Sequence, residues 1–192
     1  MILASKSPRR QQILEESGFN LEIIPAEIEE KSNKILVEEK IMDIAGLKSV
    51  YIAKKFPSQY VLGADTIVLL DGELIGKPKD EKEAFQMLEK LSGRVHQVIT
   101  GYSFTNLEKN IKLTGYEKTR VYFRKLTDYI INWYIGTQEP MDKAGAYGIQ
   151  GRGAFLVERI EGDFFNVMGF PISNFIKKLE EIHIKVEELD KI

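Results

Sequence analysis

Near the middle of the chain, residues 60–72 read YVLGADTIVLLDG. The run up to Leu70 is strongly apolar, which is typical of a buried strand, and the Asp-Gly pair after it predicts a tight turn. One carboxylate, Asp65, interrupts the run, and a buried carboxylate is costly without partners or a metal. The small residues before it, Gly63 and Ala64, would leave room for a ligand to approach. The alternative is an aspartate at a strand end that bonds only to backbone, and this segment alone does not decide between them.

On both sides of this strand, apolar periodicity and capping residues predict alternating helices and strands. We expect strands at residues 2–4, 19–24, 60–70, 95–105, 112–124 and 154–160, and helices at 8–17, 38–56, 81–91, 128–135 and 171–182. A glycine-punctuated loop is expected at 139–153. Elements in this order predict an α/β fold around a partly antiparallel sheet, and 192 residues fit one domain or two lobes on one sheet.

Composition excludes several classes of function. The formal net charge is -2, so no global field attracts nucleic acid or an anionic membrane, and we expect neither as a partner. The absence of cysteine excludes disulfides, thiolate metal sites and a cysteine nucleophile. The first residues lack the apolar core of a signal peptide, and the longest apolar run is too short to span a bilayer. We therefore expect a soluble cytoplasmic protein.

Two segments place cations on turns or helix starts. Ser7-Pro8-Arg9-Arg10 combines a helix cap with two arginines, and cations there oppose the helix dipole unless an anion binds. Gly76-Lys77-Pro78 holds a lysine on a turn. Taken singly, each segment is also compatible with ordinary surface residues.

The loop at residues 142–151 reads DKAGAYGIQG. Glycines let backbone approach a phosphate or a base closely, and Gln150 offers one donor group and one acceptor to a base edge. The chain has no P-loop motif, and its only histidines, His96 and His183, cannot form a histidine metal cluster. We interpret His96 as structural. What remains is a set of carboxylates for a hard cation such as Mg²⁺ and basic residues for phosphates, which fits nucleotide hydrolysis without a covalent intermediate.

Taken together, these segments resemble the Maf family of nucleotide pyrophosphatases, named for septum formation inhibition. The resemblance runs nearly end to end and rests on motifs in a fixed order: residues 3–10 (LASKSPRR), Ile28-Glu29-Glu30, the helix with Lys48, Gly63-Ala64-Asp65-Thr66, Gly76-Lys77-Pro78, residues 92–96 (SGRVH), the 142–151 loop and residues 167–171 (VMGFP). Two departures from the common pattern are small: Ser49 stands where alanine is usual, and Phe170 where leucine is usual.

The resemblance implies an elongated mixed β-sheet flanked by helices, related to the inosine triphosphate pyrophosphatases, with two lobes and a cleft. It implies one Maf-like domain over residues 1–192, a divalent cation (Mg²⁺ or Mn²⁺) and a homodimer. It also implies residue roles: Asp65 as the catalytic proton acceptor; Ser7, Arg9, Lys48, Lys77 and Lys143 on the phosphate side; Glu30 and Asp65 near the metal; and Arg9, Thr66 and Gln150 in substrate choice.

The 142–151 loop resembles the branch that acts on dTTP and UTP, which predicts hydrolysis of these pyrimidine nucleotides, including modified ones, to monophosphate and pyrophosphate. The alternative is a nucleotide-binding regulator of cell division that acts through a protein partner. A pure binder needs the basic residues but not a costly aspartate beside them, so the sequence favours the enzyme.

Overall fold

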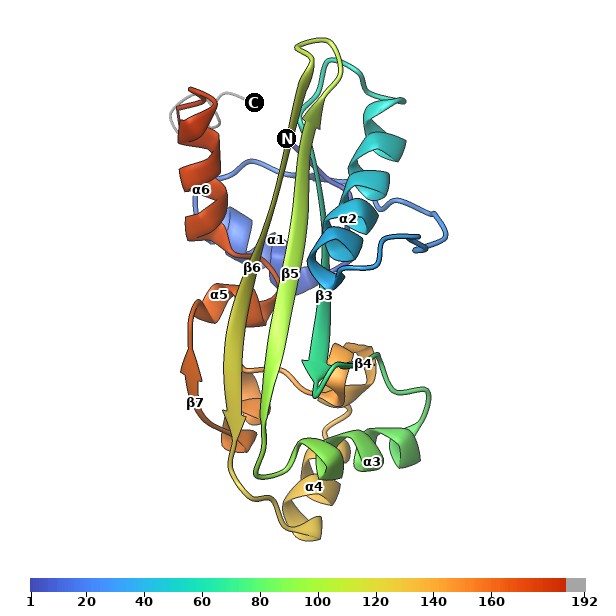
Figure 1. Ribbon diagram of the computed structural model, residues 1–192, viewed down its shortest axis with the longest axis vertical. Coiled ribbons are helices and arrows are strands. Elements are labelled where there is room, and N and C mark those ends of the chain that lie inside the picture. The colour runs from blue at the N-terminus through green and yellow to red at the C-terminus, as the bar shows by residue number, and fades with distance from the viewer. Residues whose placement is uncertain (186–192) are drawn as a thin grey trace. The chain divides into compact units, whose positions relative to one another are not determined.

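The structure, a computed structural model, describes residues 1–185. Its seven-stranded sheet has the order β2-β1-β3-β5-β6-β7, with β4 paired to β3 (Figure 1). The strands are β1 (Ile2–Leu3), β2 (Glu22–Ile23), β3 (Val61–Leu70), β4 (Glu73–Ile75), β5 (Val95–Asn106), β6 (Ile111–Phe123) and β7 (Val157–Glu161). The helices are α1 (Pro8–Glu16), α2 (Val37–Ala53), α3 (Glu81–Leu91), α4 (Asp128–Ile135), α5 (Phe164–Met168) and α6 (Ile172–Glu181), with short 3-10 turns at η1 (Glu139–Asp142), η2 (Ala144–Ala146) and η3 (Gly151–Leu156).

Strand directions confirm the predicted mixed sheet. Strand β1 pairs in parallel with β2 and β3, whereas β4 is antiparallel to β3 and β7 to β6. The chain divides into two compact units: unit 1 holds Met1–Asp65, Thr100–Glu117 and Gly169–Ile192, and unit 2 holds Thr66–Ile99 and Lys118–Met168. The single domain, the elongated shape and the cleft between lobes stay predictions.

Local capping chemistry explains why several helices begin where predicted. Ser7 caps α1, with its Oγ accepting from the Arg10 N–H, and Pro8 fills the first helical position. The Asp80 carboxylate accepts from the Glu83 N–H at 2.7 Å, so α3 starts at residue 81 as expected. Thr127 caps α4 in the same way.

Other boundaries differ from the prediction. The strand expected at residues 19–24 pairs only at Glu22–Ile23, and the strand expected from residue 154 begins at Val157, because the residues before it form the 3-10 turn η3. Strand β4 and helix α5 were not predicted from the sequence. They have three and five residues, too short for apolar periodicity to register.

In unit 1, helix α2 packs directly on the sheet through two glycines. A Cβ on Gly63 would lie 2.3 Å from the carbonyl oxygen of Ala45, and one on Gly101 would lie 2.8 Å from the carbonyl carbon of Ile41. Both strands therefore admit the helix backbone where a side chain would block it. Helix α6 adds Phe175, whose ring contacts three other buried aromatic rings of this unit within 5.3–5.5 Å.

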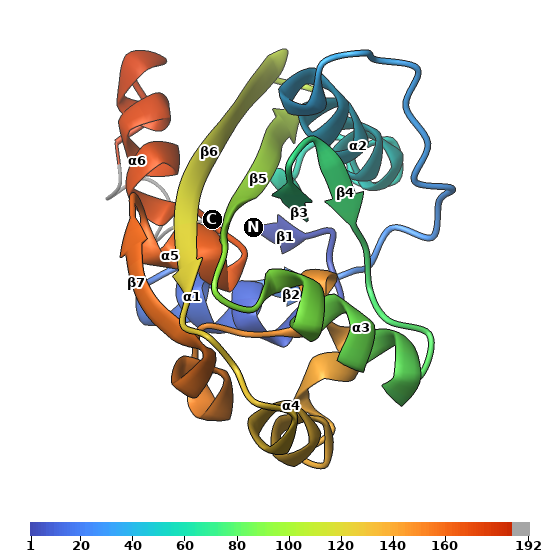
Figure 2. The same cartoon turned by 60° about the horizontal axis from the view of Figure 1, so that its bottom comes forward.

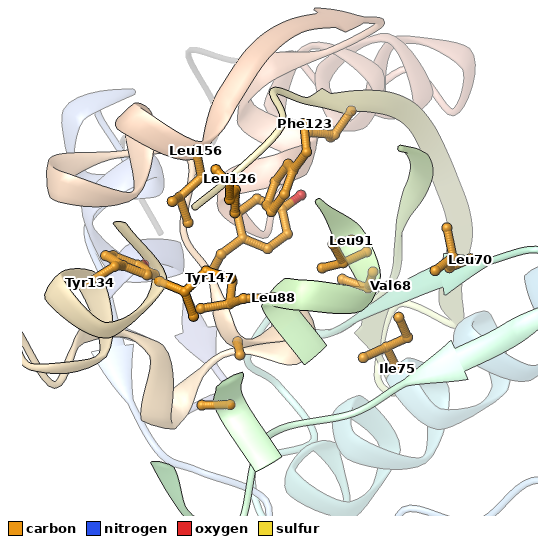
Figure 3. Close-up of a cluster of buried hydrophobic side chains, with 14 of the residues drawn as sticks. Val68, Leu70, Ile75, Leu88, Leu91, Phe123, Leu126, Tyr134, Tyr147 and Leu156 are labelled. Atoms are coloured by element: carbon orange, nitrogen blue, oxygen red, sulfur yellow. The ribbon is translucent and has the colours of Figure 1, made fainter. Parts of the chain in front are cut away.

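Unit 2 has its own apolar core, shown in Figure 3. Helices α3 and α4 pack side by side, as Figures 1 and 2 both show, and supply Leu88, Leu91 and Tyr134 to this core. The loop before η3 supplies Tyr147. Among residues 1–185, no helix has the length and apolar character needed to cross a membrane.

Candidate active site

Helix α2, and not a ligand, fills the space beside Gly63. The built Cβ position at this glycine lies within 3.2 Å of Ala45, Ser49 and Lys48, all on the helix. The expectation that the small residues before Asp65 leave room for a ligand is therefore wrong. The glycine instead brings Lys48 close to the strand that carries Asp65.

Lys48 lies between two carboxylates in unit 1. Its Nζ is 2.8 Å from Oδ1 of Asp65 and 2.9 Å from Oε1 of Glu30. The lysine side chain is only 8% exposed, against 17% for Asp65 and 52% for Glu30. A buried ammonium needs such partners, and it fixes both carboxylates at one point although the sequence separates them by a helix.

Next to Lys48 on α2, the buried hydroxyl of Ser49 contacts two other buried hydroxyls. Ser49 Oγ is 3.0 Å from Ser103 Oγ and 3.0 Å from Thr105 Oγ1, both on β5. These hydrogen bonds join helix α2 to strand β5 at the residue next to Lys48. Ser49, the departure from the usual alanine, thus has a packing role in this chain.

The start of α1 contributes a buried arginine to unit 1. Arg10 donates through Nε to the Gly169 carbonyl at 2.9 Å and through a terminal nitrogen to Ser5 Oγ at 2.8 Å. Burial lowers the pKa of Arg10 from its ordinary value, while the negative charges of Asp65 and Glu30 act in the opposite direction. The guanidinium therefore belongs to the electrostatic surroundings of the carboxylate pair.

Five of the predicted site residues lie in unit 1 and four in unit 2. The unit 1 set is Ser7, Arg9, Glu30, Lys48 and Asp65, and the unit 2 set is Thr66, Lys77, Lys143 and Gln150. The two sets meet along the chain in β3, where Asp65 is followed directly by Thr66.

The unit 2 set is built around the 142–151 loop. The Gly145 N–H donates to the Gly76 carbonyl at 2.9 Å, which ties the loop to the segment that carries Lys77. The Lys143 ammonium donates to the Glu139 carbonyl at 2.5 Å and pairs with its neighbour, the Asp142 carboxylate, at 2.6 Å.

The other end of the loop is also anchored. The Gly148 N–H donates to the Tyr134 hydroxyl at 3.1 Å. Gly153 packs against this point so tightly that a Cβ there would lie 1.9 Å from the Gly148 carbonyl oxygen. Gln150 lies two residues after Gly148 and directly before η3, so its backbone is held between the fixed points at Gly148 and Gly153.

Glu30 and Asp65 are the two carboxylates of the cluster around Lys48 that could help to hold a divalent cation, with its remaining ligands from phosphate and water. Mg²⁺ is usually held by one or two carboxylates plus substrate oxygens and keeps several waters. Glu30 and Asp65 supply two carboxylates at one point. Within residues 1–185 there is no group of three or more acidic, histidine or cysteine side chains that could bind the ion without a substrate.

Comparison with known proteins decides the family. The sequence pattern of the family described as Maf-like protein matches residues 1–182. The chain belongs to the Maf family. The resemblance stated on the motifs is thereby confirmed, and the match includes every predicted site residue.

Several relatives of this Maf-like chain share one name. A protein of Fusobacterium nucleatum subsp. nucleatum called dTTP/UTP pyrophosphatase is 53% identical over 192 residues, which is 100% of each chain. Proteins with the same name from Pyrococcus furiosus and Bacillus pumilus are 49% and 46% identical, and the alignments cover 95% to 97% of each chain. A solved structure, that of the Staphylococcus aureus Ham1 protein, aligns with 64% of this chain and 70% of its own at a TM-score of 0.44 and 17% identity.

Sequence reasoning missed two residues around this Maf-like site. From the sequence, Arg10 is expected either to join Arg9 at a bound anion or to lie on the surface; in the structure it is buried and bonds to Gly169 and Ser5. Its signal is the spacing to Ile13 and Leu14, three and four residues on, which places it on the buried face of α1. Tyr147 was treated as part of a loop, and an aromatic residue among glycines was the available sign that the loop is anchored in the core.

Proposed function

We propose that this protein is a nucleoside triphosphate pyrophosphatase that hydrolyses dTTP and UTP to the monophosphate and pyrophosphate. The observation that carries the proposal is the 53% identity, over the full length of both chains, with a protein named for this activity. The cluster of Glu30, Lys48 and Asp65 supplies chemistry that suits the reaction.

The reaction joins water to the α-phosphorus and breaks the bond between that phosphorus and the oxygen that bridges to the β-phosphate. The bridging oxygen leaves with pyrophosphate, and the water proton passes to a base. Negative charge grows on the leaving oxygens, and positioned cations are the main means of stabilising it. Arg9, Lys77 and Lys143 are the residues we assign to the phosphates.

Asp65 is our candidate for the base. A carboxylate that orients or deprotonates the attacking water typically contributes about 10²–10⁴-fold to the rate. Lys48 holds the Asp65 carboxylate in one orientation at 2.8 Å and prevents it from turning freely. The lysine therefore acts on the reaction through the geometry of Asp65 as well as through its charge.

We propose further that Glu30 and Asp65 hold a divalent cation, Mg²⁺ or Mn²⁺, together with the substrate. When bound, such an ion would offset charge on the phosphate oxygens and lower the pKa of a coordinated water. Excess EDTA should abolish turnover, and added Mg²⁺ should restore it. Full activity in EDTA would refute the metal requirement while leaving the substrate assignment intact.

Base choice is assigned to Gln150. Thymine and uracil present acceptor, donor and acceptor along one edge, whereas cytosine replaces one acceptor by an amino group and the ring N–H by an acceptor. A glutamine amide could flip to suit either edge, so discrimination needs a loop that holds it in one orientation. An unpaired buried polar group costs about 1–3 kcal/mol, or roughly 5- to 150-fold in relative rate. We expect dTTP and UTP well ahead of CTP and the purine triphosphates.

The deciding experiment measures pyrophosphate release from dTTP, UTP, CTP, ATP and GTP, with Mg²⁺ and with EDTA. Release from dTTP and UTP above the others supports the proposal. Tight nucleotide binding without turnover would favour the regulator of cell division, which the names of the relatives do not favour. Gln150→Ala should narrow the gap between UTP and CTP, and an unchanged ratio would remove Gln150 from base choice.

We further propose that the protein is a homodimer and that it acts in the cytoplasm. The support for both is the family resemblance. Light scattering on the purified protein distinguishes a dimer of the 22.0 kDa chain from the monomer. Fractionation of cells tests the compartment.

A further inference from the structure

A buried polar contact joins the sheet of unit 2 to the 142–151 loop. Nε2 of His96, on β5, is 2.6 Å from the hydroxyl of Tyr147, which lies in the loop between Lys143 and Gln150. His96 is 2% exposed and Tyr147 5% exposed. Figure 3 shows the Tyr147 ring inside the unit 2 core, beside Phe123. The contact thus fixes the middle of the loop from within.

The packing of the neighbouring rings fixes the geometry of this contact. The His96 ring meets Tyr147 and Phe123 edge-on, with centroids 5.3 Å and 5.0 Å away and interplanar angles of 84° and 83°. Phe123 and Tyr147 meet edge-on in turn, at 4.7 Å. Three mutually perpendicular rings leave the tyrosine hydroxyl no freedom to swing away from the imidazole.

The pair is costly for the fold. Burial lowers the pKa of His96 to about 4 and raises the pKa of Tyr147 well above its ordinary value, so both are neutral near pH 7. Nδ1 of His96 is buried without a hydrogen-bond partner, the one such side-chain atom in the part of the chain that the structure describes. Two phenylalanine rings would fill the same space and would leave no buried nitrogen without a hydrogen-bond partner.

A second cost lies directly next to this contact. Ala146, the residue before Tyr147, has a φ of 56°, in the left-handed region that disfavours residues with a Cβ. Such conformations persist where surrounding contacts enforce them, and they cluster at functional sites. Both costs fall on the segment that carries the residues assigned to phosphate and base.

We infer that His96 is a positioning residue for substrate selection: its hydrogen bond to Tyr147 fixes the 142–151 loop, and the fixed loop holds Gln150 in the one orientation that distinguishes uracil and thymine from cytosine. The inference rests on the proposed function. Base choice by an amide that can flip requires a rigid loop, and the His96–Tyr147 hydrogen bond supplies that rigidity. His96 then has a role beyond core packing.

The test compares variants that remove the polar contact with one that keeps it. Tyr147→Phe removes only the hydroxyl. The double variant His96→Phe/Tyr147→Phe removes the contact and also the orphaned nitrogen, so it should fold at least as stably as the wild type. His96→Gln keeps a hydrogen-bonding group near the Nε2 position and serves as the conservative rescue.

Two readouts are measured on each folded variant. The ratio of kcat/KM for UTP to that for CTP should fall at least about 5-fold in Tyr147→Phe and in the double variant, mainly through KM for UTP, and stay within about 2-fold of wild type in His96→Gln. Hydrogen exchange of the loop amides should quicken by about 10-fold or more in the same two variants, with the amides of α2 as the internal reference.

Unchanged loop exchange and an unchanged UTP-to-CTP ratio in the stable double variant would overturn the inference and leave His96 a core residue. If the wild type released no pyrophosphate from any nucleotide, the proposed function would fail. The exchange measurement, made without nucleotide, would still decide whether the pair fixes the loop.

Discussion

Replacing Gly63 by alanine should separate the helix and strand that carry Lys48 and Asp65. The added Cβ would lie 2.3 Å from the Ala45 carbonyl oxygen and 2.8 Å from the Ser49 nitrogen, both in the backbone of α2. A carbon rests about 3.3 Å or more from a carbonyl oxygen, so the helix must withdraw by roughly 1 Å. Backbone cannot turn aside as a long side chain can.

The expected cost follows from this geometry. Overpacking of a well-packed core costs typically about 1–3 kcal/mol, and two backbone contacts below 3.0 Å place this variant at the upper end. For a chain of this size, 3 kcal/mol corresponds to a fall in Tm of roughly 6–12 °C. The withdrawal also moves Lys48 relative to Asp65, and a 1 Å misplacement can cost about 10²-fold in rate, so activity per folded molecule should fall as well.

Gly46→Ala is the matched control on the same helix. A Cβ at Gly46 would meet only Ser103 Oγ, at 3.9 Å, an ordinary contact. Alanine in a helix interior is favoured over glycine by about 0.5–1 kcal/mol, so this variant should be more stable than the wild type. Urea denaturation followed by circular dichroism measures both variants, with unchanged m-values expected. The reasoning fails if Gly63→Ala lies within about 0.5 kcal/mol of wild type, or if it is more stable than Gly46→Ala.

Three further predictions concern charged and titrating groups. Asp65→Asn should remain folded and lose about 10²–10⁴-fold in kcat; near-normal turnover would remove Asp65 from catalysis. Lys48→Met should lower the free energy of unfolding by about 3 kcal/mol, because it leaves a largely buried carboxylate without its cation, and a urea midpoint equal to wild type would contradict this. Burial holds the pKa of His96 at about 4, below the ordinary 6.5, so the unfolded chain binds that proton more readily and stability falls as the pH drops from about 6.5 towards 4. Between pH 7 and pH 5, His96→Gln should therefore lose about 2 kcal/mol less stability than the wild type; equal losses in the variant and the wild type would mean that His96 does not titrate as a buried group.

Much of the fold could be predicted because its signals are local. The caps at Ser7, Asp80 and Thr127 act within three residues, so the helix starts they set were predicted correctly. Strands β3, β5 and β6 are long enough for their apolar pattern to be unmistakable. Strand β4 pairs with the preceding end of β3 across the Asp71-Gly72 turn, and Asp163 caps α5. At three and five residues, both elements are too short to show an apolar period of their own.

The candidate site divides in the same way. The order of the motifs along the chain identified the family, because residue types and spacings are a property of the sequence alone. The prediction for Gly63 was wrong for a physical reason. A small residue near Asp65 indicates that another group packs closely against the strand, but only the folded chain shows that this group is helix α2 and not a ligand.

Residue types and their spacing were therefore enough to predict the order of the longer helices and strands, the family and the set of residues available for nucleotide chemistry. Tertiary structure decided which of them act together: Lys48 meets Asp65 across 17 residues, His96 meets Tyr147 across 51, and Arg10 bonds to a carbonyl 159 residues away. Each is a contact between distant segments, whose energy depends on burial and on the exact partner and not on neighbours in the chain. For that reason the buried arginine and the histidine–tyrosine pair emerged only with the fold.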